Sequence, residues 1–354
     1  MRVLVVKMSA LGDIIHALPV LDYLHRAHPG IQVDWVAESP FRDVLEGNPL
    51  ISQLHLVSTK VWRKRPLASE TWRAVGSLKR ELRARSYDLV FDIQGNLKSG
   101  LIASLAGCGT VVGFAASELQ ERINLLFTTK RVTLLPQDRH ITDQYLRLVS
   151  SCFGRDFSAM RLTSDIATSP ADASLAESLL ASLPPGRKFL FHQGTTWDTK
   201  YWLKENWIEL GRQLLASFQG ASVLLSWGNE GEKEVAGAIA SAIGPGARVI
   251  DRYPLKGFAA LLKRMDVVVG GDTGPVHIAA AVGTPTVSLY RASDGRRSGP
   301  RGDRHVIIQA PLHCTACFRT KCQRDHECRA SITVSSVMKG IESIFKDSRG
   351  GEHG

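Results

Sequence analysis

The stretch that decides the fold reads DVVVGGDTGPVHIAAAVGTPTVSLY and spans residues 266–290. It opens with a run of valines, passes through Gly270 and Gly271, continues with helical spacing after Pro275, and ends in a second apolar run. Short apolar runs of this kind are typical of strands buried on both faces, and strand–helix–strand units build parallel sheets. The stretch therefore predicts a strand at 266–270, a helix at 273–282 and a strand at 284–290.

The same alternation runs through the whole chain. Further apolar runs predict strands at 3–6, 33–37, 54–57, 89–93, 110–114, 188–192, 221–226 and 248–250. Amphipathic stretches predict helices at 11–26, 67–85, 97–105, 142–152, 205–217, 230–242, 255–264 and 334–345. Periodicity is weak at 155–170, which indicates a linker. We therefore expect an α/β protein with two Rossmann-like parallel-sheet domains facing a central cleft, residues 1–158 and 168–330. A helix over 331–347 and a frayed tail over 348–354 follow.

Length and composition agree with this architecture. The chain has 354 residues, 44% hydrophobic and 22% charged, which is ordinary for two globular domains and excludes disordered, collagen-like and coiled-coil proteins. No window approaches the roughly 18 apolar residues of a membrane span, and the apolar run at residues 3–6 is shorter than that of a signal peptide. The sequence thus predicts a cytoplasmic protein.

The net charge of +10 is concentrated in one segment. Between Lys60 and Arg85 there are nine basic residues and only two acidic ones. Such a surface favours polyanions, which include nucleic acid, anionic lipid and phosphorylated small molecules. A solvated helix face is the simpler interpretation of the same pattern.

Ligands of parallel sheets bind where strands end, so the residues after each predicted strand are the candidates for chemistry. Asp13 follows the first strand and is either a helix cap or a general base for an incoming hydroxyl. The loop Asp272-Thr273-Gly274 precedes a helix whose free N–H groups favour an anion, with His277 on the first turn as a further donor. A tight packing turn and a core histidine are the structural alternatives.

Two further loops of the second half carry ligand-binding side chains. Thr195, Thr196 and Lys200 follow the strand at 188–192 and could bind a diphosphate, or could form a polar loop closed by core tryptophans. Glu230 and Glu232 follow the strand at 221–226, and either could bind ribose hydroxyls or simply favour a helix N-terminus.

Four of the six cysteines lie close together, at Cys314, Cys317, Cys322 and Cys328. A structural zinc site, reduced thiols packed in a loop and redox pairing are all compatible with this spacing. None of them makes the segment catalytic.

Several of these motifs, in this order, resemble the glycosyltransferase family that contains the lipopolysaccharide heptosyltransferases (glycosyltransferase family 9). Residues 7–19, KMSALGDIIHALP, resemble the family's N-terminal signature, and Asp272-Thr273-Gly274 with His277 resembles its nucleotide-sugar motif. Thr195, Thr196 and Lys200 resemble its threonine pair and lysine. The resemblance covers nearly the whole chain.

Within the family, the resemblance is strongest to heptosyltransferase I. Residues 61–65, VWRKR, resemble its basic acceptor loop, and Asp92-Ile93-Gln94-Gly95 with Lys98-Ser99 resembles its second-strand turn. Arg122 and His140 fall where that enzyme has an acceptor-side arginine and histidine. The four-cysteine segment and the residues Trp197 and Tyr201 depart from its pattern.

The resemblance implies a GT-B fold with the donor bound mainly by the C-terminal domain. It implies heptose transfer from ADP-L-glycero-β-D-manno-heptose to the 3-deoxy-manno-octulosonic acid (Kdo) of Kdo–lipid A, with inversion and without a catalytic metal or other cofactor. The enzyme would be peripheral on the inner face of the cytoplasmic membrane. The implied residues are Asp13 as base; Thr195, Thr196, Lys200, Glu232, Asp272, Thr273, Gly274 and His277 for the donor; and Arg63, Lys64, Arg65, Arg122 and His140 for the acceptor.

Three rival functions share some of these features. A heptosyltransferase II, or another core transferase of the same family, would use a later acceptor. A nucleotide-sugar epimerase would need acids poised on the donor sugar, which the sequence does not place. A nucleic-acid-binding protein would account for the charge, but the sequence has no motif of a known nucleic-acid-binding module, and no nucleic-acid partner is expected.

Overall fold

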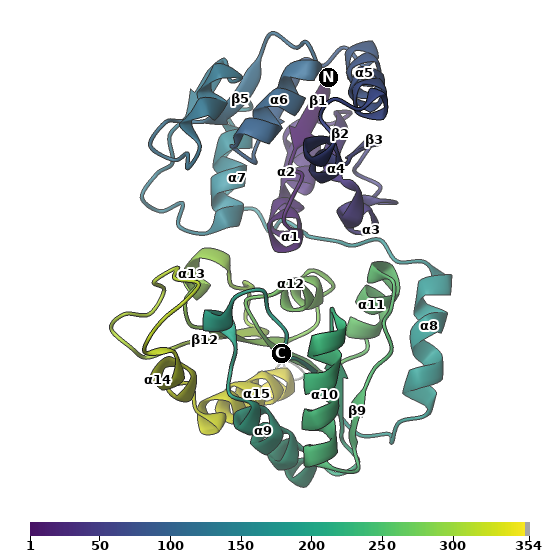
Figure 1. Ribbon diagram of the computed structural model, residues 1–354, viewed down its shortest axis with the longest axis vertical. Helices are drawn as coiled ribbons and strands as arrows, with labels where there is room; N and C mark the ends of the chain where they lie inside the picture. Colours follow the sequence, from purple (N-terminus) through teal and green to yellow (C-terminus); the bar gives the residue numbers. More distant parts are fainter. Residues whose placement is uncertain (351–354) are drawn as a thin grey trace. The chain divides into compact units, whose positions relative to one another are not determined.

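The computed structural model describes the backbone of residues 1–350 and the side chains of residues 1–346. The chain divides into two compact units, Met1–Ala167 and Thr168–Gly354 (Figure 1). Among the described residues, no helix combines the length and the apolar character needed to cross a bilayer.

The first unit contains a six-stranded sheet in which all neighbouring strands are parallel. Its strands are β1 (Arg2–Val6), β2 (Gln32–Glu38), β3 (Gln53–Val57), β4 (Leu89–Asp92), β5 (Val111–Phe114) and β6 (Lys130–Val132). Its helices are α1 (Leu11–Ala17), α2 (Pro19–Ala27), α3 (Arg42–Leu45), α4 (Thr59–Lys64), α5 (Ser69–Ala84), α6 (Leu97–Leu105) and α7 (Ile141–Ser150), with 3₁₀ turns η1 (Ser39–Phe41) and η2 (Arg122–Leu126).

The second unit contains another all-parallel six-stranded sheet. Its strands are β7 (Lys188–His192), β8 (Ser222–Ser226), β9 (Ala247–Val249), β10 (Val267–Gly271), β11 (Thr286–Tyr290) and β12 (His305–Gln309). Its helices are α8 (Pro170–Ala181), α9 (Lys204–Ser217), α10 (Glu230–Ile243), α11 (Leu255–Leu262), α12 (Gly274–Ala281), α13 (Gly295–Ser298), α14 (Asp325–Ala330) and α15 (Val334–Gly350), with the 3₁₀ turn η3 (Asp198–Lys200).

Both sheets have the same strand order. It is β3-β2-β1-β4-β5-β6 in the first unit and β9-β8-β7-β10-β11-β12 in the second. The chain builds outward from its first strand and then returns to the other side of that strand, so the order reverses between β1 and β4 and between β7 and β10. In open parallel sheets, this switch point leaves a crevice at the carboxyl ends of the two strands. The predicted Rossmann-like architecture of both halves is confirmed.

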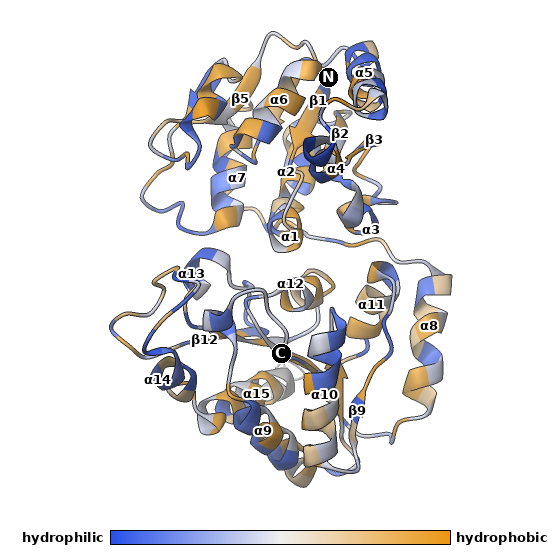
Figure 2. Ribbon diagram, in the orientation of Figure 1, coloured by the Kyte–Doolittle hydropathy of each residue, from blue (hydrophilic) through white to orange (hydrophobic). Residues whose placement is uncertain are grey.

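Each sheet is covered on both faces by helices. In the first unit Leu4 and Val6 pack under Leu78 of α5 and Ile102 of α6, and on the opposite face Phe91 contacts the ring of Phe153. In the second unit the core joins the strands to α9, α10 and α15. Figure 2 shows the hydrophobic strands and the hydrophilic outer helix faces that result. The apolar runs read in the sequence are therefore the strands buried on both sides.

The prediction of one continuous helix at 11–26 is wrong. This stretch is broken into α1 and α2 at Pro19, which begins the second helix because proline has no N–H to continue the first. The sequence reading also missed β6, β12 and α8. The first two are edge strands and lack a long apolar run, since β6 has only three residues and β12 is only partly buried along its length. Helix α8 begins where the predicted linker ends, capped by Ser169.

The C-terminal helix begins and ends three residues later than the predicted range 331–347. Residues 348–350, predicted as the start of a frayed tail, continue α15, and residues 351–354 of that tail lie outside the described residues. Val337 and Ile341 of α15 are fully buried in the core of the second unit. This helix is therefore an integral part of that unit.

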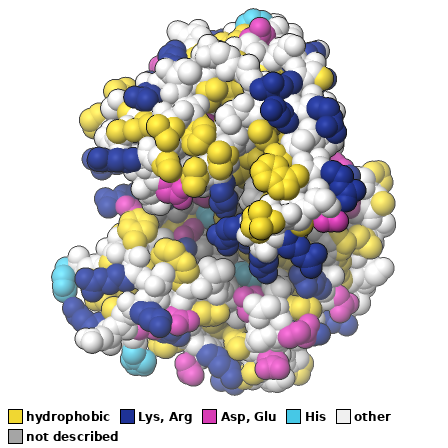
Figure 3. All heavy atoms as spheres, turned by 45° about the horizontal axis from the view of Figure 1, so that its top comes forward, with side chains coloured by type: hydrophobic (Ala, Val, Ile, Leu, Met, Phe, Trp, Pro, Cys, Tyr) yellow, Lys and Arg dark blue, Asp and Glu magenta, His cyan; other side chains and the backbone are white. Residues whose placement is uncertain are grey.

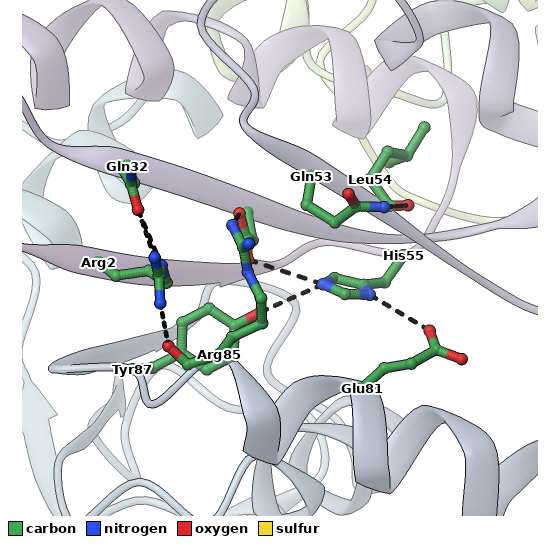
Figure 4. Close-up of polar contacts among 9 residues, drawn as sticks. Arg2, Gln32, Gln53, Leu54, His55, Glu81, Arg85 and Tyr87 are labelled. Atoms are coloured by element: carbon green, nitrogen blue, oxygen red, sulfur yellow. Dashed lines mark hydrogen bonds and ion pairs between the residues drawn. The ribbon is translucent and has the colours of Figure 1, made fainter.

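One polar cluster of the first unit lies inside the sheet rather than at its carboxyl edge (Figure 4). Buried Asp34 of β2 accepts two hydrogen bonds from Arg85 and one from Tyr87, and His55 of β3 contacts Tyr87 and Asp34. Burial alone would raise the pKa of Asp34, but hydrogen bonds from His55, Arg85 and Tyr87 outweigh it and lower the pKa to about 2. The cluster ties the end of the basic helix α5 to the sheet.

Candidate functional site

The loop after β10, where the sequence predicts an anion site, lies at the second switch point. A Cβ atom on Gly270 would lie 2.7 Å from Val276, so only glycine lets the chain turn here so closely. Thr273 is the N-cap residue of α12, and its side chain makes no hydrogen bond to the first turn of the helix. The first-turn N–H groups therefore keep their capacity for an anion, which the helix dipole also favours.

Asp272, beside this helix end, joins two of the predicted residues. Its carboxylate lies 2.6 Å from Nζ of Lys200 and 3.2 Å from Nε2 of His277, and all three side chains are largely buried. Burial would raise the pKa of Asp272, but the hydrogen bond from His277 and the charges of His277 and Lys200 hold it well below its usual value. The Lys200 ammonium also lies 4.6 Å from the centre of the Trp197 ring. The ionised Asp272 thus fixes a lysine from the loop after β7 next to the start of α12.

The threonine pair lies on the same loop as Lys200. Thr196 is exposed, whereas Oγ1 of Thr195 is buried and has no hydrogen-bond partner among the described residues. A buried hydroxyl without a partner costs about 1–3 kcal/mol, so such a group is typical of a site that a ligand completes. Thr195 also accepts, through its backbone oxygen, a 2.9 Å hydrogen bond from the Tyr201 hydroxyl, which holds the loop.

The two candidate glutamates, Glu230 and Glu232, have different surroundings in the structure. Glu230 is exposed and lies near Lys233, whereas the Glu232 carboxylate accepts hydrogen bonds from the Gly228 N–H at 2.7 Å and from Asn229 at 3.0 Å. A Cβ atom on Gly194 would lie 2.3 Å from the Glu232 carboxyl group. Glu232 is therefore the acid placed against the loop that carries the threonine pair.

The surroundings of Asp13 are compatible with both roles that the sequence left open, a helix cap and a general base. Asp13 accepts a hydrogen bond from the Ala10 N–H at 3.3 Å, as a helix-capping acid does, and lies 3.7 Å from Nζ of Lys7. Its side chain is nevertheless 43% exposed, whereas that of Lys7 is 4% exposed. An accessible carboxylate at the end of β1, next to a buried cation, can accept a proton from a hydroxyl.

Gln94 is a residue whose function the motif reading did not identify. Its Oε1 accepts hydrogen bonds from the N–H groups of Met8 and Ser9, at 2.9 and 3.1 Å, and so fixes the loop that leads to Asp13. The turn that carries Gln94 is held by fully buried Asp92, which accepts bonds from Ser99, Asn124 and the turn's own N–H groups. Burial raises the pKa of Asp92. The signal available in the sequence was the position of this turn at the end of the strand beside β1.

The predicted acceptor residues all follow strands of the first sheet, but they differ in exposure. Arg63, Lys64 and Arg65 are exposed at the end of α4, and Arg122 is exposed at the start of η2. His140 is 5% exposed and caps α7, since its Nδ1 accepts the Thr142 N–H at 3.2 Å. The structure gives His140 a structural role and leaves it little surface to offer an acceptor.

The four-cysteine segment connects β12 to α14 and the start of α15. All six cysteines are free, and no group of three or more His, Cys, Asp or Glu side chains within the described part of the chain is arranged to hold a metal ion. Cys328 packs against the core of the second unit, and its burial raises the pKa of the thiol. The present geometry of these thiols therefore does not support the zinc hypothesis.

Known proteins resemble this chain over most of its length. The profile of glycosyltransferase family 9 (heptosyltransferase) matches residues 75–327. Lipopolysaccharide heptosyltransferase 1 of Pseudomonas aeruginosa is 34% identical over 91% of this chain and 87% of its own length, and that of Escherichia coli K12 is 30% identical over 88% and 94%.

A solved structure shows the same fold. Escherichia coli heptosyltransferase WaaC with ADP has 28% sequence identity and a TM-score of 0.78, and the match covers 97% of this chain and all of that one. The GT-B fold expected from the sequence is thus confirmed by this match. The chain belongs to glycosyltransferase family 9, the heptosyltransferases.

Proposed function

We propose that this enzyme is a heptosyltransferase I, which transfers L-glycero-D-manno-heptose from ADP-heptose to the Kdo of Kdo–lipid A with inversion. The observation that carries the proposal is the match to proteins named lipopolysaccharide heptosyltransferase 1, at 30% and 34% identity over about nine tenths of this chain. A related WaaC structure holds ADP-2-deoxy-2-fluoro heptose, which supports ADP-heptose as the donor.

The donor belongs to the C-terminal domain, residues 168–330, in this proposal. The diphosphate binds at the first turn of α12, formed by Thr273 and Gly274, with Lys200 beside it. The unpartnered Thr195 hydroxyl, together with Thr196, donates to a phosphate oxygen, and Glu232 accepts from the ribose hydroxyls. Asp272 and His277 act indirectly, because they hold Lys200 and the start of the helix in place.

Asp13 acts as the base. It removes the proton from the attacking Kdo hydroxyl as that oxygen bonds to the anomeric carbon, and the bond from this carbon to the ADP oxygen breaks on the opposite face. One displacement of this kind inverts the anomeric configuration. Negative charge that develops on ADP is offset by the α12 dipole and the Lys200 ammonium, a stabilisation that requires no catalytic metal. Undiminished activity in the presence of EDTA is the expected result.

The acceptor belongs to the N-terminal domain, residues 1–158. Arg63, Lys64, Arg65 and Arg122 are exposed cations that suit the carboxylates of Kdo and the phosphates of lipid A. His140, which is buried, contributes by ordering the start of α7. The net charge of +10 and the basic segment 60–85 support a peripheral position on the inner face of the cytoplasmic membrane, where such an acceptor is anchored.

The deciding experiment measures ADP release from ADP-heptose with two acceptors. One is Kdo₂–lipid A, and the other already carries the first heptose. Turnover with Kdo₂–lipid A alone is the expected result. Turnover only with the heptosylated acceptor would make the enzyme a second-heptose transferase, and no turnover with either would contradict the proposed donor or the proposed acceptor class.

A further inference from the structure

We infer that the corner between α4 and α5, residues 59–73, inserts into an anionic bilayer. Val61, Leu67 and Trp72 enter the headgroup region, while the surrounding lysines and arginines bind lipid phosphates. This inference rests on the proposed function, which places the acceptor in a membrane, and it names the segment of the enzyme that contacts the lipid.

The first observation is the exposure of three large apolar side chains in one short segment. Leu67 is 91% exposed, Trp72 65% and Val61 57%. Five large apolar side chains in the described part of the chain are more than half exposed, and these three are the ones that share a single corner. Apolar side chains scattered singly over a surface are ordinary, whereas a group of them marks a contact surface.

The second observation is that an ordered backbone presents these side chains. The Arg65 N–H donates to the Val61 oxygen at 3.1 Å, and the Thr71 hydroxyl donates to the Arg65 oxygen at 2.8 Å. The Trp72 N–H donates to the Ala68 oxygen at 3.3 Å, and Trp62 packs inward against the core. The corner is therefore a closed turn between two helices, and it holds its apolar side chains outward.

The third observation is the charge around the apolar group. Lys60, Arg63, Lys64 and Arg65 have no ion-pair partner among the described residues, and the only acid in the corner, Glu70, pairs with Arg73. On α5, Lys79 and Arg83 follow Trp72 at the i+7 and i+11 spacing that returns to the same helix face. Leu78 and Leu82 face the core instead.

This combination fits a bilayer surface better than a soluble anion. A soluble anion would use the cations and leave the apolar side chains exposed to water. The interface of an anionic bilayer accepts both, since it has phosphates at its surface and acyl chains just below, and tryptophan favours this boundary. Figure 3 shows hydrophobic side chains lying directly beside Lys and Arg side chains on the molecule's surface.

The test is sedimentation of the full-length enzyme with vesicles of phosphatidylethanolamine and phosphatidylglycerol, and with vesicles of phosphatidylcholine. We expect binding to the anionic vesicles and at least about tenfold weaker binding of the double variant Leu67→Ser/Trp72→Ser. The matched control, Val235→Ser/Phe318→Ser, replaces two exposed apolar side chains of the second unit and should bind as the wild type does. Bromine-labelled acyl chains should quench the tryptophan fluorescence of the wild type, and Trp72→Phe should remove most of that quenching.

Equal binding of wild type and the Leu67→Ser/Trp72→Ser variant would overturn the inference, as would failure of the wild type to bind anionic vesicles. A variant that binds vesicles normally but loses self-association would show that the corner contacts a second copy of the chain. A Kdo disaccharide without acyl chains separates the inference from the proposed function, because the variant should turn it over as the wild type does. If the wild type turned over no Kdo acceptor, the proposed function would fail, and the vesicle result would still decide the inference.

Discussion

Asp272→Asn tests whether the buried ion pair with Lys200 holds the loop after β7 in place. The substitution keeps the size of the side chain and removes the charge that faces Lys200 at 2.6 Å and His277 at 3.2 Å. Lys200 and Asp272 are only 14% and 12% exposed, so water can replace the lost partner only in part. Removing one member of a buried pair costs about 3–5 kcal/mol, and we expect the lower end because an amide can still accept a hydrogen bond from Lys200.

The assay is thermal unfolding followed by calorimetry, with the transition of the second unit, Thr168–Gly354, as the readout. For a unit of this size a loss of about 3 kcal/mol lowers Tm by about 6–12 °C. The matched control is Glu327→Gln, because Glu327 forms a 2.7 Å pair with Arg324 in which both side chains are half exposed. Such surface pairs contribute about 0–1 kcal/mol. Equal Tm values for Asp272→Asn and Glu327→Gln would refute the argument that the Asp272 pair holds the loop.

Four further predictions concern the individual sites. Asp13→Asn should lower kcat by about 10²–10⁴ and leave ADP affinity, measured by calorimetry, unchanged; a loss of ADP binding would make Asp13 structural. Gln94→Leu should lower kcat by about tenfold or more, because it leaves the N–H groups of Met8 and Ser9 without their acceptor. Gln94→Glu keeps an acceptor oxygen and should restore most of the lost kcat, and failure of that rescue would exclude a positioning role. Gly194→Ala should weaken ADP binding, because the added Cβ collides with the Glu232 carboxyl group. In a Glu232→Ala background the same change should have little further effect on ADP binding, and additive effects of the two changes would contradict this reasoning. The pKa of Asp34 is lowered to about 2, so its contribution to stability is full above its unfolded pKa and is lost as the pH falls below about 4. The difference in free energy of unfolding between wild type and Asp34→Asn should therefore shrink by about 2 kcal/mol between pH 5 and pH 2, and a constant difference would show that Asp34 is not paired.

The motifs read in the sequence meet at the two switch points for a topological reason. The loops after β1 and β4 are neighbours because β4 pairs with β1, and the loops after β7 and β10 are neighbours because β10 pairs with β7. In each unit a side chain from one loop holds the other: Gln94 binds the loop of Asp13, and Lys200 binds Asp272. The repeated strand order thus brings Gln94 to the loop of Asp13 in the first unit and Lys200 to Asp272 in the second.

Much of the fold was predictable because it depends on periodicity along the chain. Strands buried on both faces need apolar runs such as 266–270, and these runs located the central strands of both sheets. The edge strands β6 and β12 escaped because they are less buried and their sequences need no such run. The break between α1 and α2 was missed because the apolar spacing on either side of Pro19 is equally helical.

The sequence by itself determined the α/β alternation, the residue types at the strand ends, the basic segment and the family resemblance, because each of these is a local pattern. The tertiary structure alone decided which of those residues act together. It separated Glu232 from Glu230, placed Asp272 between Lys200 and His277, buried His140, and brought Gln94 to the loop of Asp13. The contacts of Gln94 with Met8 and of Lys200 with Asp272 join residues that lie far apart in the chain, so they depend on strand order and packing, which no local pattern encodes.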